Sequence, residues 1–178
     1  MTMKRFMLAL LLSALVGCTG VPKGIVAVDH FELNRYLGTW YEIARIDNWF
    51  ERGTEQVSAT YSLREDGMVR VFNKGYDPDK RRWKTIEGRA KFVGDPTVGE
   101  LKVSFFGPFY AGYNVIDLDR ERYSWAMVSG SSRSYFWILS RTPQMDRTLV
   151  SRLLSDAHTR GFDTLKVIRV RQETTPSP

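Results

Sequence analysis

Apolar and polar residues alternate in short runs along most of this chain, and turn residues separate the runs. An alternation with a period of two is typical of strands that bury one face. Eight such runs are predicted to form strands, at residues 37–45, 56–63, 68–76, 82–93, 101–106, 110–118, 123–129 and 135–141. Because short turns join them in sequence, the pattern predicts an all-β fold, an eight-stranded antiparallel up-and-down barrel.

The hydrophobic period changes after the eighth predicted strand. Between Gln144 and Arg160 the apolar residues recur at helical spacing, and Gly161 follows where a helix C-cap is expected. This pattern predicts one C-terminal α-helix packed on the outside of the barrel. A last short strand is predicted at residues 166–171, and the polar tail at residues 173–178 is predicted to be disordered.

One end of the barrel is predicted to be closed by an arginine that lies over a tryptophan. Gly38 and Trp40 share one face of the first strand, and Glu42 and Ala44 follow on that face if the alternation is unbroken. Arg141 ends the eighth strand, at a rim of the barrel. An arginine over an indole face contributes about 0.5 to 2 kcal/mol. We therefore expect Gly38, Trp40 and Arg141 to form the closure.

The closure residues belong to three regions that resemble the signature regions of the lipocalins. The first region is Gly-x-Trp at residues 38–40, and the third is the late Arg141. The second is the strand end Asp117-Leu118-Asp119 with Tyr123 just after it. The family usually has Thr-Asp-Tyr at this place, so either aspartate can occupy the family's position.

The resemblance extends over residues 25–172. Three longer runs make it specific to one group within the family. The runs at residues 35–45, 102–109 and 137–143 are similar to the bacterial outer-membrane lipoproteins of the family, which are relatives of apolipoprotein D. The resemblance implies a protein that binds a fatty acid or a lysophospholipid in its barrel. Such a protein would act in lipid storage, transfer or envelope maintenance.

The first seventeen residues are interpreted as a signal peptide. Lys4 and Arg5 precede an apolar run that is too short to span a membrane comfortably. The run ends in Leu15-Val16-Gly17-Cys18, which resembles a bacterial lipobox. That resemblance implies that Cys18 is acylated, with fatty acids such as palmitate, and becomes the first mature residue. Thr19 follows rather than Asp, which by the same resemblance implies the outer membrane.

The mature chain is expected to have two parts. Residues 18–29 contain turn residues and no apolar period, so they are predicted to form a mobile, lipidated tether. Residues 30–172 are predicted to form the lipocalin barrel domain. The tether would hold the barrel at the periplasmic face of the outer membrane.

Charge and residue types limit which binding partners and catalytic groups are expected. The chain has 26 Lys and Arg against 20 Asp and Glu, a formal charge of +6, which favours anionic surfaces such as phospholipid head groups without indicating nucleic acid. Cys18 is the single cysteine, and His30 and His158 lie far apart in the strand and helix pattern. No catalytic residue, metal site or cofactor is therefore expected.

The predicted barrel is wide enough either to fill itself with side chains or to hold one small ligand. The small residues Ala44, Ala59, Gly88 and Ala90, set among large aromatic ones, favour an open cavity. The residues predicted to line it are Ala59, Tyr61, Ala90, Phe92, Val103, Phe105, Tyr113, Met127, Tyr135 and Trp137. The assignment assumes unbroken alternation, because one bulge would invert the facing of part of a strand.

The sequence is also compatible with other functions and with other contacts of the barrel. The barrel could hold the hydrophobic substrate of an enzyme, although the lack of a histidine pair, a thiol or a metal cluster argues against catalysis. A filled barrel would instead indicate a structural lipoprotein that acts through protein contacts. Trp49-Phe50 and the aromatic run at residues 105–113, predicted to be a loop, either pack on the barrel's own rim or form an apolar lip for a membrane or protein contact. A homodimer is compatible with these features.

Overall fold

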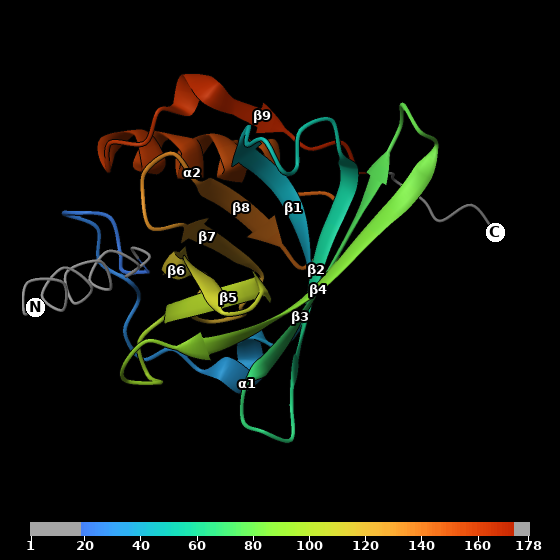
Figure 1. Ribbon diagram of the computed structural model, residues 1–178. Coiled ribbons are helices and arrows are strands. Elements are labelled where there is room, and N and C mark those ends of the chain that lie inside the picture. The colour runs from blue at the N-terminus through green and yellow to red at the C-terminus, as the bar shows by residue number, and fades with distance from the viewer. Residues whose placement is uncertain (1–18, 173–178) are drawn as a thin grey trace, which may run out of the picture.

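Eight antiparallel strands close into a barrel in the computed structural model, which describes residues 19–172 (Figure 1). The strands are β1 (Gly38–Ile46), β2 (Glu55–Leu63), β3 (Val69–Asp77), β4 (Arg82–Phe92), β5 (Glu100–Phe106), β6 (Phe109–Leu118), β7 (Trp125–Ser129) and β8 (Phe136–Ser140). Each strand pairs with the next, and β1 pairs with both β2 and β8, which closes the barrel. The predicted all-β barrel is therefore confirmed. The predicted signal peptide at residues 1–17, the acylated Cys18 and the tail at residues 173–178 lie outside the described residues.

The helix α2 (Arg147–Thr159) packs against the outside of the barrel, as predicted (Figure 1). It begins later than the spacing of apolar residues predicts, because the Asp146 carboxylate accepts the N–H of Leu149 as an N-cap. A short 3-10 helix, η1 (Thr164–Lys166), separates α2 from β9 (Val167–Arg169), which pairs with β1. Within residues 19–172, no helix has the length and apolar character needed to cross a membrane.

A single helical turn, α1 (Leu33–Tyr36), precedes β1 and covers one end of the barrel (Figure 1). The sequence pattern does not predict it, because four residues are too few to show a helical period. Its last residue, Tyr36, is buried, and the Tyr36 ring lies 4.8 Å from the Trp40 indole. We call this the closed end, and the opposite end, where β1 connects to β2, the open end.

A bulge in β1 changes which side chains face the barrel interior. The register between β1 and β8 shifts between Glu42 and Ala44. Ala44 therefore packs under α2, and the expectation that it shares the interior face of Trp40 is wrong. Arg45 is turned inward instead, on the same face as its partner Trp137. An extra residue in one strand inverts the alternation beyond it.

A second bulge, in β6 where it pairs with β7, turns Asp117 to the outer face of the barrel. The register shifts between Val115 and Asp117, so Asp117 stands opposite Met127. Met127 is fully buried in the apolar cluster between the sheet and α2. The prediction that Met127 lines the interior is wrong because β7 pairs with β8 in unbroken register, which places Met127 opposite Ile138 on the outer face, whereas Val128 faces the interior with Trp137.

Residues 19–29 lie along the barrel wall, so the prediction of a mobile tether is wrong for them. Ala27 and Val28 are buried, and the N–H of Val28 donates to the carbonyl of Val115 at 2.9 Å. Ile25 packs on the cluster beneath α2. The turn residues earlier in this segment led to the prediction of mobility, although the segment has a short apolar face that the barrel buries.

The aromatic run at residues 105–113 is largely strand rather than loop. β5 and β6 continue to a tight connection, in which Phe106 pairs with Phe109. The side chains of Phe106 and Phe109 are exposed, whereas Phe105 and Tyr113 pack on the interior cluster. The run therefore contributes both to the interior and to the surface of the open end.

Candidate ligand-binding site

The closed end is sealed by an arginine over an indole, as the sequence suggests. The Arg141 guanidinium carbon lies 3.9 Å from the centroid of the Trp40 ring, and Trp40 is fully buried. Arg141 donates from Nη2 to the carbonyl of Arg35 at 2.6 Å and from Nη1 to that of Thr39 at 3.0 Å. Gly38 has a φ of +94°, a conformation that strains any other residue, and a Cβ there would also crowd Arg141 Nη1 at 3.3 Å.

The turn between β6 and β7 supports the same closure. The Asp119 carboxylate accepts hydrogen bonds from groups of the turn that follows it. This turn presents the carbonyl of Tyr123 to Arg141 Nε at 3.2 Å. Asp117 instead forms an ion pair with Arg160 outside the barrel, so Asp119 is the aspartate that shapes the closed end.

Truncating the arginine tests how much this closure contributes to stability. We expect Arg141→Ala to lower the free energy of unfolding by about 1 to 3 kcal/mol, because it exposes an indole face and leaves the carbonyls of the rim without their donor. Urea unfolding of Arg141→Ala, Trp40→Phe and the double variant measures the coupling between the two side chains. Strictly additive effects would show that the stacking contributes nothing of its own.

The interior is closely packed near the closed end and less completely buried toward the open end. The predicted lining residues that pack on the interior cluster and are only partly buried are Ala59, Phe92, Val103, Phe105, Tyr113 and Trp137. Tyr61 and Ala90 are buried, and Phe92 packs edge-on against Phe31 at the closed end. Tyr135 lies at the open end, stacked on Trp137 with the ring centroids 6.3 Å apart. The partly buried residues form an apolar wall above the buried rings of Phe31, Tyr36, Trp40 and Tyr61, which we call the aromatic floor.

One small residue does not leave free volume, contrary to the expectation from sequence. A Cβ on Gly88 would lie 2.7 Å from the ring of Phe105, so the aromatic side chain already fills the space beside the glycine. Ala59, by contrast, stays partly exposed toward the interior. The free space of the barrel is therefore expected beside β2 rather than beside β4.

Three tyrosine hydroxyls form a polar cluster inside the aromatic floor. Tyr36 Oη and Tyr113 Oη lie 2.7 Å apart, and Tyr61 donates to Tyr113 Oη at 2.9 Å. Burial raises the pKa of Tyr61 and that of Tyr113 above their ordinary value, so both hydroxyls stay neutral. The cluster satisfies its own hydrogen bonds while presenting an aromatic surface above it.

A buried Glu42–Arg45 pair lies toward the open end, and sequence reasoning missed its arginine because the β1 bulge turns it inward. Arg45 Nη1 donates to Glu42 Oε1 at 2.6 Å, and both side chains are almost completely buried. Burial, together with the nearby charge of Glu51, raises the pKa of Glu42 to about 8, although Arg45 opposes the rise. Arg45 Nε is buried and makes no hydrogen bond within residues 19–172.

The loop at residues 47–54 covers this Glu42–Arg45 pair from the open end. The Glu51 carboxylate accepts from the Trp137 indole at 3.1 Å and from Asn48 Nδ2 at 2.6 Å. Arg45 Nη2 donates to the carbonyl of Glu51 at 2.8 Å. No periodic pattern marks these contacts in the sequence, because they depend on how the loop folds back over the barrel.

The raised pKa of Glu42 predicts a pH-dependent stability. Between about pH 4.5 and 8, Glu42 holds a proton in the folded protein but has lost it in the unfolded chain. The free energy of unfolding therefore falls as the pH rises through this range. The slope from one such group is at most about 1.4 kcal/mol per pH unit. We expect Glu42→Gln, which keeps an acceptor for Arg45, to flatten the decline measured by urea unfolding from pH 6 to 8.

Glu87 provides the matched control for this measurement. Its exposed carboxylate pairs with Arg70 at 2.6 Å, and this hydrogen bond lowers the pKa of Glu87. Its contribution to stability is therefore constant above pH 4.5, so Glu87→Gln should leave the slope between pH 6 and 8 unchanged. Equal slopes in the wild type and in Glu42→Gln would contradict the assignment.

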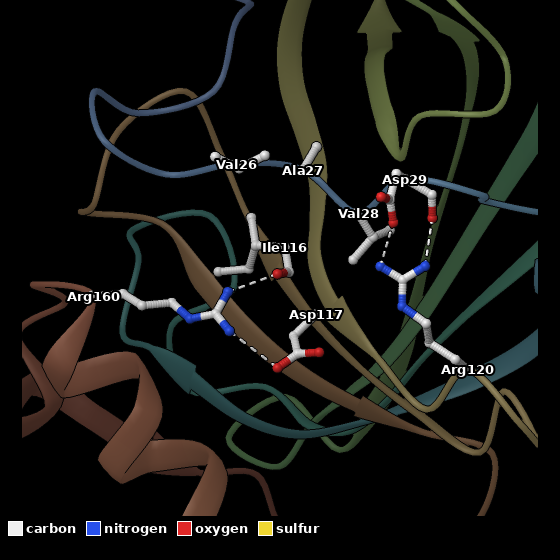
Figure 2. A pocket seen from close by; sticks show the side chains of 8 residues that line it. All are labelled: Val26, Ala27, Val28, Asp29, Ile116, Asp117, Arg120 and Arg160. Carbon is white, nitrogen blue, oxygen red and sulfur yellow. Dashed lines mark hydrogen bonds and ion pairs between the residues drawn. The ribbon is translucent and has the colours of Figure 1, made fainter.

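A pocket of about 310 Å³ lies outside the barrel, between residues 26–29 and β6 (Figure 2). Figure 2 shows that its two arginines are already engaged: Arg120 binds Asp29 at 2.6 Å, and Arg160 binds Asp117 at 3.1 Å. The first ion pair secures the N-terminal segment to the wall, and the second joins the end of α2 to β6. Among residues 19–172, no group of three or more His, Cys, Asp or Glu is placed to hold a metal ion.

Comparisons with known proteins agree with this geometry. The model of the lipocalin-like domain family matches residues 31–172. The outer membrane lipoprotein Blc of Citrobacter freundii is 56% identical over 151 residues, which cover 85% of each chain. The protein of the same name from Vibrio cholerae is 50% identical and covers 96% of this chain and all of its own length. Apolipoprotein D of Macaca fascicularis is 32% identical, covering 96% of this chain and 97% of its own.

Solved structures share the fold at low sequence identity. The cockroach allergen Per a 4 superposes with a TM-score of 0.66 at 20% identity and covers 86% of this chain and 96% of its own. Insecticyanin from the tobacco hornworm Manduca sexta also gives 0.66, at 19% identity, and covers 87% of this chain and 88% of its own. These two structures support the barrel architecture alone.

Proposed function

Because the chain belongs to the lipocalin family, we propose that it is a lipid-anchored protein that binds one single-chain lipid, a fatty acid or a lysophospholipid, inside its barrel. The observation that carries this proposal is the partly exposed apolar wall between the aromatic floor and the loop at residues 47–54. An eight-stranded barrel has room for one small ligand, which suits one acyl chain rather than two. The role we propose is lipid storage, transfer or envelope maintenance.

The polar groups of the site suggest how such a lipid lies. The closed end is aromatic, whereas Arg45, Asn48 and Glu51 gather toward the open end. An acyl chain directed to the closed end would place its head group beneath the loop at residues 47–54. Arg45 Nε, which is buried without a hydrogen bond in the described part of the chain, is a donor suited to a carboxylate or phosphate there.

The location follows from the anchor and from the relatives. Several relatives at 50% identity or more are named outer membrane lipoproteins. We infer that this chain is likewise held at the periplasmic face of an outer membrane through acylated Cys18. We infer binding rather than catalysis, since the interior groups described here hold one another in place and leave no nucleophile beside a base.

A titration with a fluorescent fatty acid tests the proposal directly. Trp137 lies in the wall, so a bound ligand is expected to quench tryptophan emission in a saturable way that fits one site. A lysophospholipid should displace the probe competitively. Emission that changes linearly with the probe, with no displacement, would show a barrel that holds no lipid.

A further inference from the structure

The connections at the open end of the barrel form one face of the molecule. In an antiparallel barrel β1, β3, β5 and β7 run in the same direction, so the connections that follow them gather at the same end. These connections are residues 47–54, 78–81, 107–108 and 130–135. Figure 1 shows α1 at the other end of the barrel, away from the tip of the β3–β4 hairpin.

This face carries a set of exposed aromatic side chains, which we call the aromatic rim. The rim consists of Trp49, Phe50, Phe106 and Phe109, and these residues are 78%, 51%, 73% and 68% exposed. Large aromatic side chains exposed together on a soluble domain usually mark a contact with a membrane or another protein. Tryptophan in particular favours the interface between water and lipid.

The path of the N-terminal segment indicates that the aromatic rim contacts a membrane rather than another protein. A Cβ on Gly112 would lie 2.7 Å from both the Thr19 carbonyl and Ser131 Oγ, so the segment begins beside the β7–β8 connection of the open end. It then descends the wall, and the N–H of Phe31 donates to the carbonyl of Thr97 in the β4–β5 connection at the closed end. Cys18 is bonded to Thr19, so acyl chains on Cys18 would leave the protein close to the open end.

Charge at the same end agrees with an anionic lipid surface. The exposed turn between β3 and β4 contains Lys80 and Arg81 beside Asp79, and Arg82 begins β4, so basic residues outnumber the acid there. Basic residues next to a membrane anchor are attracted to anionic head groups. Neither this charge nor the anchor position would be needed for a contact between two copies of the chain.

We propose that the acyl anchor holds the open end against the bilayer, with the aromatic rim inserted among the lipids and the barrel mouth facing the membrane. This inference rests on the proposed acylation of Cys18. A lipid would then pass between the bilayer and the barrel without crossing bulk water. The loop at residues 47–54, which carries Trp49 and Phe50 and covers Arg45, is the element that meets the membrane and the ligand together.

Quenching of tryptophan by brominated lipids tests this orientation. The full-length acylated protein is first saturated with palmitic acid and reconstituted into phosphatidylethanolamine and phosphatidylglycerol vesicles whose acyl chains carry bromine. We expect strong quenching of the wild type and loss of most of it in Trp49→Phe. Leu63, exposed at the end of β2 near the closed end, supplies the matched control: Trp49→Phe combined with Leu63→Trp should restore no quenching.

The outcomes separate this inference from the proposed function. Quenching that survives unchanged in Trp49→Phe, or that appears with Leu63→Trp, would overturn the orientation. Protection of Trp49 from bromine together with a dimer in analytical ultracentrifugation, abolished by Trp49→Ser and Phe50→Ser, would instead assign the rim to a second copy. The fatty-acid titration, repeated on the same proteins, stays positive if only the orientation is wrong.

Discussion

Replacing Ala59 by tryptophan is expected to abolish fatty-acid binding while the barrel stays folded. Ala59 lies in the middle of β2, opposite Trp40 and Asn73 in the neighbouring strands, and its side chain is partly exposed toward the interior. An indole at this position would occupy the space proposed for the acyl chain. In free space it costs little stability, so the titration should lose its saturable phase while urea unfolding stays within about 1 kcal/mol of the wild type.

Ala90 provides the contrasting variant on the solid side of the barrel. It is 4% exposed and stands between its strand partners Val69 and Val103 near the closed end. We expect Ala90→Trp to lower the free energy of unfolding by about 1 to 3 kcal/mol or more, because the neighbouring side chains must move to admit an indole. If Ala59→Trp destabilises the protein as strongly as Ala90→Trp, the interior is filled throughout and the protein acts through its surface.

Replacing Cys18 by serine is expected to move the whole protein from the membrane fraction to the soluble fraction. The hydroxyl of serine cannot carry the thioether-linked lipid that a lipobox cysteine receives, and stable anchoring requires two or more acyl chains. The barrel itself should be unaffected, so the soluble variant should titrate with fatty acid as the wild type does. Fractionation with salt and carbonate washes measures the change, with Thr19→Ser as the matched control.

Persistence of Cys18→Ser in the membrane fraction after both washes would show that Cys18 is not the anchor. The aromatic rim alone is expected to give only weak, reversible association, because four exposed side chains bury little area compared with acyl chains. The two contributions are therefore separable by the washes.

The barrel and its closure are predictable from sequence because they depend on local signals. Turn residues separate the strands, and the alternation of apolar and polar residues within each strand shows which face is buried. At the closure, Gly38 supplies a backbone conformation that other residues disfavour, and Arg141 stacks on Trp40. The apolar stripe of α2 is equally local, and Asp146 could have refined where the helix begins.

The interior face is less predictable because bulges are set by packing between strands. One extra residue in β1 moves Ala44 beneath α2 and brings Arg45 inside, and one in β6 places Asp117 on the outer face, opposite Met127. No composition rule marks either position. Two groups of the candidate site, Arg45 and Glu51, are therefore visible only in three dimensions.

The N-terminal segment shows a different limit of sequence reasoning. Its turn residues predict mobility, but Ala27 and Val28 give it enough apolar surface to pack on a wall that already exists. The segment is ordered only by its contacts with the barrel wall, so its own hydrophobic pattern cannot predict the path it takes. That path is what relates the proposed anchor to the open end.

Native mass spectrometry of the protein purified from its own membrane tests the central claim most directly. We predict a folded protein whose mass exceeds that of the acylated chain by one fatty acid or one lysophospholipid, and whose extra mass is lost in Ala59→Trp. Folded wild-type protein that carries no lipid, and that accepts none when titrated with fatty acid or lysophospholipid, would contradict the account.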